Sequence, residues 1–109
     1  MIQPIPYEEA RSMIGITEVQ VPTLGNRSSF AIWIENGLIM MRNSRGSIGK
    51  IDKVHWEAVM QRISAVPENE REMTSRYVLG TYPYNWNQPP NKIFSPAVPA
   101  IVRYLQAMR

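Results

Sequence analysis

Four cations lie close together between residues 41 and 53, in the stretch MRNSRGSIGKIDK: Arg42, Arg45, Lys50 and Lys53. Arginine and lysine side chains bind phosphate and carboxylate groups, and arginine can do so through two parallel hydrogen bonds. The glycines in the same stretch add a turn whose backbone N–H groups could also face an anion. The stretch therefore predicts contact with nucleic acid or another anionic partner, without catalysis. A plain hairpin turn with solvated cations has the same composition, so both interpretations stay open.

The sequence GSIGK in this stretch does not match a nucleotide-binding P-loop. That loop has four residues between its glycines and a serine or threonine after its lysine, which holds magnesium. Two residues separate Gly46 from Gly49, and Ile51 follows Lys50. We therefore expect no nucleotide hydrolysis at this turn.

Other catalytic chemistry has few candidate residues. The chain has no cysteine and one histidine, His55, which excludes disulfides, thiolate catalysis and metal sites built from cysteine or several histidines. The lone aspartate, Asp52, directly precedes a predicted helix and is explained as its N-cap. No glutamate pair is indicated as an acid and base. We therefore predict no catalytic residue, no metal and no cofactor, and we favour a protein without enzymatic activity.

A second candidate site is the uncharged stretch YPYNWNQPPN, residues 82–91, with the aromatic residues Tyr82, Tyr84 and Trp86. Tyrosine and tryptophan stack on bases and are enriched in protein interfaces. They could also cover a small-molecule pocket between the loop and the sheet. The alternative is that the rings fold back over the sheet edge, and the composition does not decide between these interpretations.

Residues 29–43 carry the strongest structural signal. Two runs of β-branched and aromatic residues, SFAIWIE and LIMMRN, are separated by Asn36 and Gly37, a pair typical of a two-residue hairpin turn. The register set by that turn puts five apolar side chains on one face, the expected core face: Phe30, Ile32, Ile34, Ile39 and Met41. The opposite face carries Trp33 and Met40. Either the hairpin is covered on both sides, or these two residues belong to a contact patch for a protein partner or a homodimer.

Further strands are predicted on both sides of this hairpin. Residues 17–21 and 47–51 are expected to be extended, and residues 76–81, RYVLGT, are another candidate strand. Together with the helices described next, they predict a single α+β domain over residues 1–109. Its architecture is an antiparallel three- to four-stranded meander with a central helix, a C-terminal helix and a short N-terminal helix.

Three helices are predicted from capping residues and apolar periodicity. A short helix is expected at residues 6–13, a central helix from 53 to about 64, and a C-terminal helix after Ser95 and Pro96. The apolar stripe of the central helix is Trp56, Val59, Met60 and Ile63. The corresponding stripe of the C-terminal helix is Ile101, Val102, Leu105 and Met108.

Composition and charge exclude some classes of protein. The hydrophobic fraction of 44% among 109 residues is that of a folded globular chain, and the net charge is +3. No apolar run approaches the roughly 20 residues that span a bilayer. The first residues, MIQPIPYEEA, lack a charged start followed by an apolar stretch, so no secretion signal is expected. These features predict a cytoplasmic protein without a membrane partner.

The stretches PTLGNRSSFAIWI and NSRGSIGKID are followed by a helix with Trp56 and Arg62, and then by SRY before the loop of tyrosine, asparagine and tryptophan. This order resembles that of small accessory modules found beside bacterial restriction or homing-type endonucleases. The likeness spans about residues 23–105 and includes no catalytic motif. The length of the chain is also typical of the short products of mobile gene cassettes. The resemblance implies DNA-related binding by a stand-alone domain.

Overall fold

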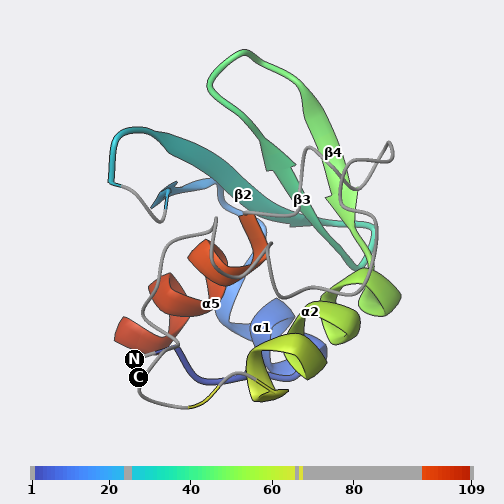
Figure 1. Cartoon of the computed structure of the whole chain (residues 1–109). Coiled ribbons are helices and arrows are strands. Elements are labelled where there is room, and N and C mark those ends of the chain that lie inside the picture. Colours follow the sequence, from blue (N-terminus) through green and yellow to red (C-terminus); the bar gives the residue numbers. More distant parts are fainter. Residues whose placement is uncertain (1, 24–25, 66, 68–96, 109) are drawn as a thin grey trace.

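The computed structural model describes residues 2–23, 26–65, 67 and 97–108 (Figure 1). Within these residues, four strands form one antiparallel sheet in the order β1-β2-β3-β4. The strands are β1 (Val19–Pro22), β2 (Ser29–Glu35), β3 (Leu38–Arg42) and β4 (Ile48–Ile51). The helices are α1 (Tyr7–Ile14), α2 (Lys53–Ala65) and α5 (Ala97–Ala107). The predicted α+β fold with an antiparallel meander and three helices is confirmed.

The β2–β3 hairpin has the predicted turn and the predicted register. Asn36 and Gly37 both have positive φ, 54° and 74°, as a type I′ turn requires. Ile34 pairs with Ile39, and the pairing continues to the end of β3. Of the five side chains expected on the core face, four are buried, and Ile34 is half-buried and packs against the core.

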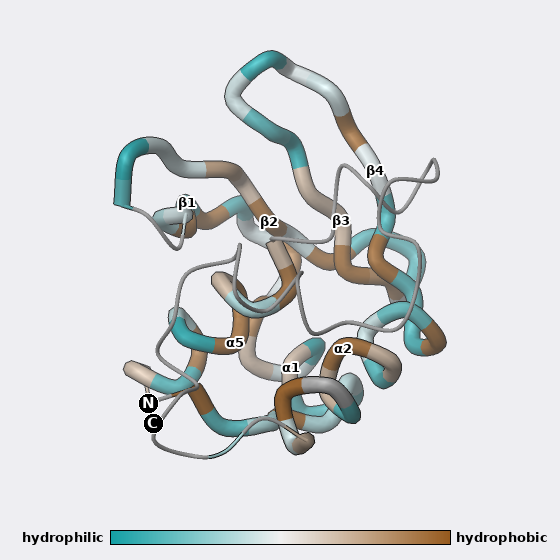
Figure 2. Tube along the Cα trace, in the orientation of Figure 1, coloured by the Kyte–Doolittle hydropathy of each residue, from teal (hydrophilic) through white to brown (hydrophobic). Residues whose placement is uncertain are grey.

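All three described helices pack on the same face of the sheet (Figure 1). The core lies between the helices and the sheet and is built from residues of both, and Figure 2 shows hydrophobic residues along the strands and helices. The face of the sheet that points away from the helices is called the outer face below. It carries alternate residues of each strand, because successive side chains of a strand point to opposite sides.

Helix α2 begins as the sequence predicts. The Oδ1 atom of Asp52 accepts a hydrogen bond of 2.8 Å from the backbone N–H of His55, which is an N-cap contact. The predicted stripe of α2 is buried: Trp56, Val59, Met60 and Ile63. The indole of Trp56 also donates a 2.7 Å hydrogen bond to the carbonyl of Ile5, which fixes the N-terminal segment against α2.

The side chain of Tyr7 ties α1 to the sheet. Its hydroxyl donates to the carbonyl of Ile51 at 2.5 Å and accepts from the N–H of Ile39 at 3.1 Å. Ile39 and Ile51 are neighbours on β3 and β4. The phenol ring lies edge-on to Trp56, with 5.9 Å between ring centroids. Tyr7 therefore links the first helix, two strands and α2 in the interior.

Helix α5 differs from prediction at its end. Ile101, Val102 and Leu105 are buried as expected, but Met108 is 57% exposed, so its placement in the core was wrong. The physical reason is that α5 ends at Ala107, and Met108 lies in the turn that follows, off the helical stripe. The predicted strand at residues 76–81 and the start of the C-terminal helix at Ser95 and Pro96 lie outside the described residues.

Candidate functional site

Two loops project from one end of the sheet. In an antiparallel meander the first and third connections share an end, so the β1–β2 loop and the β3–β4 loop lie together, while the Asn36–Gly37 turn lies at the opposite end. Figure 1 shows both loops extending away from the helices. Their described residues, 23, 26–28 and 43–47, are called the loop end. Apart from arginines, the loop end consists of serine, asparagine, threonine and glycine, and its tips are hydrophilic in Figure 2.

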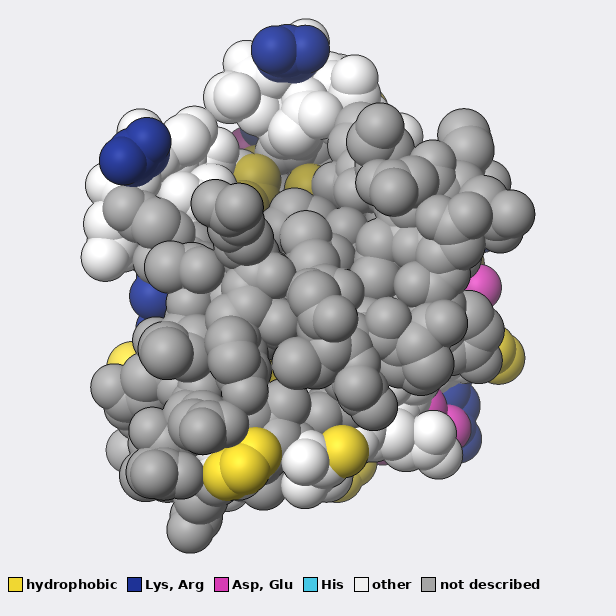
Figure 3. Space-filling model, viewed as in Figure 1, with side chains coloured by type: hydrophobic (Ala, Val, Ile, Leu, Met, Phe, Trp, Pro, Cys, Tyr) yellow, Lys and Arg dark blue, Asp and Glu magenta, His cyan; other side chains and the backbone are white. Residues whose placement is uncertain are grey.

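Each loop carries one exposed arginine, Arg27 on the β1–β2 loop and Arg45 on the β3–β4 loop. Figure 3 shows Lys or Arg side chains at the outermost points of both loops. Among the described residues, no carboxylate lies within ion-pair distance of either arginine. Two guanidinium groups at one end of the sheet are therefore available to an external anion.

Asn43 holds the β3–β4 loop in its conformation by accepting hydrogen bonds from the loop backbone. Its side-chain oxygen accepts hydrogen bonds from the backbone N–H of Arg45 at 2.9 Å and of Ser47 at 3.0 Å. Its carbonyl accepts from the N–H of Gly46 at 3.0 Å, and Gly46 has a φ of 87°. This is a three-residue hairpin loop with glycine at the left-handed position. Glycine is favoured at position 46 because residues with a side chain rarely adopt that φ.

These contacts limit the ways in which the turn could bind an anion. Three successive N–H groups, those of Arg45, Gly46 and Ser47, already donate to Asn43. Gly49 is not in the turn at all, because it pairs with Met41 within the sheet. An anion at this loop would therefore be bound by side chains, and backbone amides would contribute little.

Arg103 on α5 holds the other loop in place. Its Nη2 atom donates to the carbonyl of Thr23 at 2.8 Å and reaches Oδ1 of Asn26 at 3.4 Å. Thr23 also accepts a hydrogen bond from the N–H of Asn26. The position of Arg27 is therefore tied to the helical layer, although Arg27 itself is exposed.

Arg42, at the end of β3, lies on the outer face beside Trp33. Its guanidinium carbon is 5.7 Å from the centroid of the indole, a cation–π distance. Its Nη2 atom is 2.6 Å from Oε2 of Glu18, and the hydrogen bond and charge of Glu18 raise the pKa of Arg42. The two side chains of this ion pair are 38% and 41% exposed. Because the pair is solvated, it adds little to stability, and an external anion competes with Glu18 for Arg42.

Strand pairing brings Trp33, Met40 and Lys50 into one row across the outer face. Trp33 and Met40 are half-buried and Lys50 is exposed. In the next row toward the loop end, Arg42 pairs with Ile48, whose side chain is 60% exposed. The outer face therefore combines an aromatic ring, apolar side chains and cations, and the described helices do not cover it.

Lys53 lies apart from the other three predicted cations. It begins α2, which follows the end of β4 that is remote from the loop end. Its Nζ atom is 3.8 Å from Glu57 and 4.0 Å from Glu8. The structure therefore groups Arg42, Arg45 and Lys50 near the loop end or on the outer face, and places Lys53 among carboxylates elsewhere.

Two residues of this region were not singled out from the sequence, Arg27 and Glu18. The signal available for Arg27 was the stretch PTLGN directly before it, whose proline, glycine and asparagine favour a turn, because a meander brings that turn beside the one carrying Arg45. The partner of Arg42 was not predictable, since 24 residues separate Glu18 from it. The predicted residues Tyr82, Tyr84 and Trp86 lie outside the described residues.

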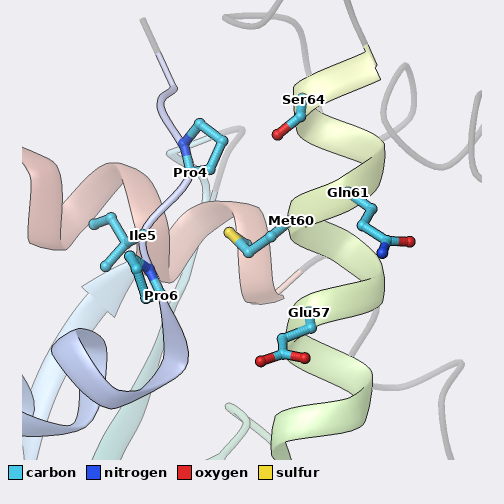
Figure 4. A pocket seen from close by; sticks show the side chains of 7 residues that line it. All are labelled: Pro4, Ile5, Pro6, Glu57, Met60, Gln61 and Ser64. Atoms are coloured by element: carbon cyan, nitrogen blue, oxygen red, sulfur yellow. The ribbon is translucent and has the colours of Figure 1, made fainter.

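A groove lies elsewhere, between the N-terminal segment and α2 (Figure 4). It is open and measures about 510 Å³. Pro4, Ile5 and Pro6 form one wall, and four α2 residues form the other: Glu57, Met60, Gln61 and Ser64. Its lining is mixed and contains no cluster of groups that indicates a ligand.

Comparisons with known proteins add no relative. No family model matches the chain, and neither the curated proteins nor the solved structures contain a match. The resemblance to accessory modules of endonucleases therefore stays a prediction. Within the described part of the chain, no group of three or more histidine, aspartate or glutamate side chains could hold a metal ion. In the same residues, no helix is long and apolar enough to cross a membrane.

Proposed function

We propose that the chain is a non-enzymatic binding module that contacts the phosphates of nucleic acid through its loop end. The observation that supports this most is the pair of exposed arginines, Arg27 and Arg45, on two loops at the same end of the sheet. Neither has a carboxylate partner within the described residues. Arg42, which is paired with Glu18, and Lys50 add two more cations on the outer face.

The distribution of acidic residues supports the same proposal. Several exposed carboxylates of the described residues lie toward the end of the sheet remote from the two loops, Glu8, Glu35, Asp52 and Glu57, whereas Glu18 lies on the outer face against Arg42. Within the described part of the chain, two cations without a carboxylate partner, Arg27 and Arg45, thus lie together at the loop end. Phosphates of a polyanion are attracted to such an end from a distance of about one Debye length, roughly 8 Å at physiological salt.

The test is a salt series. Binding of a fluorescently labelled oligonucleotide is followed by anisotropy between about 25 and 200 mM salt for the wild type and for the double variant Arg27→Gln/Arg45→Gln. Each phosphate contact contributes about −0.7 to −0.9 to the slope of log K against log salt. We expect the double variant to bind more weakly and its slope to flatten by about 1.4 to 1.8.

Lys53→Gln is the matched control, because it also removes one exposed cation but lies among glutamates at the other end. We expect it to leave the slope unchanged. Absence of binding by the wild type at the lowest salt, or equal effects of the control and a single Arg27→Gln variant, would reject the proposal.

The alternative is a protein-interaction module or homodimer that uses Trp33 and Met40. The observation in its favour is the exposure of Ile48, 60%, beside these half-buried apolar side chains. Light scattering coupled to size-exclusion chromatography measures the molar mass at increasing concentration. A mass that stays at 12.5 kDa throughout contradicts the homodimer.

A further inference from the structure

We infer that the nucleic acid is single-stranded and lies across the outer face, with a base stacked on Trp33. This inference rests on the proposed function and names the class of nucleic acid that the same surface would take. The features that carry it are the position of Trp33 beside Arg42 on the outer face, the apolar residues around it and the ion pair that lies against it.

Trp33 lies within reach of a nucleic-acid strand whose phosphate is bound at Arg42. Arg42 is the last residue of β3, and Met40, the strand partner of Trp33, lies two residues before it. Two residues of a strand span about 7 Å. A phosphate bound at Arg42 therefore places the adjoining nucleotide over the row of Trp33, Met40 and Lys50.

The chemistry of this row suits an unpaired base. An indole stacks on any base, and the flanking apolar side chains, Met40 and Ile48, give a surface that a base covers more favourably than water does. Lys50 adds a cation at the far side of the row. The bases of a duplex are stacked inside the helix and cannot lie flat on a sheet, so a duplex could use only the cations.

Glu18 is expected to weaken the contact between Arg42 and a phosphate of the single strand. Its carboxylate is 2.6 Å from Arg42, whose guanidinium lies 5.7 Å from the Trp33 centroid. A phosphate that binds Arg42 competes with Glu18 for the guanidinium. Substitution of Glu18 by glutamine removes the competing charge and leaves Arg42 beside the indole, so this variant should bind a single strand more tightly than the wild type.

The experiment compares a 15-nucleotide single strand with the duplex of the same sequence at fixed salt, for the wild type, Trp33→Leu and Glu18→Gln. We expect the wild type to prefer the single strand. Trp33→Leu should lose about 10-fold in affinity for the single strand and little for the duplex, in line with the worth of one base–aromatic stack. Glu18→Gln should gain affinity for the single strand by several-fold. Far-UV circular dichroism checks that each variant is folded, and Glu18→Gln tests the inference even where Trp33→Leu does not fold.

Three results would overturn the inference. Equal affinity for both nucleic acids, with Trp33→Leu without effect on either, places the contact on the loops alone and leaves the proposed function standing. A wild-type dimer that becomes monomeric in Trp33→Leu, with unchanged affinity for the single strand, assigns the outer face to a second copy of the chain. Failure of both nucleic acids to bind at low salt removes the proposed function itself.

Discussion

Replacement of Tyr7 by phenylalanine should destabilise the fold more than any other loss of a single oxygen atom from the described core. The hydroxyl satisfies two buried backbone groups, the N–H of Ile39 at 3.1 Å and the carbonyl of Ile51 at 2.5 Å. Tyr7 is 3% exposed, so water has little access to the groups left behind. A buried polar group without a partner costs about 1–3 kcal/mol.

The loss of stability in Tyr7→Phe depends on the two backbone groups, the N–H of Ile39 and the carbonyl of Ile51, that lose their partner. We expect the Tyr7→Phe variant to lose at least about 2 kcal/mol of unfolding free energy, which corresponds to a fall in Tm of roughly 8 °C for a chain of this size. Urea unfolding followed by circular dichroism measures the change. Tyr104→Phe is the control, because the Tyr104 hydroxyl makes no hydrogen bond within the described residues and that side chain is half-buried. A loss below about 0.5 kcal/mol in Tyr7→Phe would refute the bridging role of the hydroxyl.

The pH dependence gives an independent check. Burial is the main cause that raises the pKa of Tyr7 above its ordinary value of 10.0. An acid whose pKa is higher in the folded state stabilises the fold below its unfolded pKa, and this contribution is lost as the pH rises through the folded pKa. The stability difference between the wild type and Tyr7→Phe should therefore be constant up to about pH 9.5 and narrow above pH 10. A difference that widens in that range would contradict the assignment.

Two further predictions concern local structure. Asp52→Ala should cost about 1 kcal/mol, because the N–H of His55 loses its capping oxygen, and denaturant unfolding should show the loss; an unchanged midpoint would mean that the cap is dispensable. Asn43→Ala should speed hydrogen exchange of the Arg45 and Ser47 amides while leaving the α2 amides unchanged, since only the loop loses acceptors; equal exchange in wild type and variant would show that the turn does not depend on Asn43.

Local signals in the sequence were sufficient to predict most of the described fold. The Asn36–Gly37 turn fixed the hairpin register, because a two-residue loop leaves one pairing for each strand residue. The cap at Asp52 and the stripe that starts at Trp56 determined where α2 begins and which side it buries. Both features depend on residues close in the chain.

Contacts between residues far apart in the chain could not be predicted from the sequence. Nothing near Tyr7 in the chain indicates that its hydroxyl would meet Ile39 and Ile51, 32 and 44 residues away. The candidate site shows the same limit. Arg42 and Arg45 were found as neighbours in sequence, but the pairing of Arg45 with the Arg27 loop and of Arg42 with Glu18 needed the sheet topology.

The separation of Lys53 from the loop end has the same origin. Lys50 and Lys53 are three residues apart, yet β4 ends between them and α2 begins among carboxylates. Closeness in sequence indicated a single cluster of cations, whereas the fold leaves Lys50 on the outer face and places Lys53 at the start of α2, remote from the loop end.

Chemical-shift mapping by NMR tests the central claim most directly. A ¹⁵N-labelled sample is titrated with a short single strand at about 25 mM salt, and shifts of backbone amides are followed residue by residue. We predict that the largest shifts fall at residues 26–28 and 42–50 and at Trp33, and that Lys53, Glu57 and the rest of α2 stay unchanged. Shifts centred on α2 and the groove near Pro4, or no shifts at all, would contradict the proposal that the loop end is the binding surface.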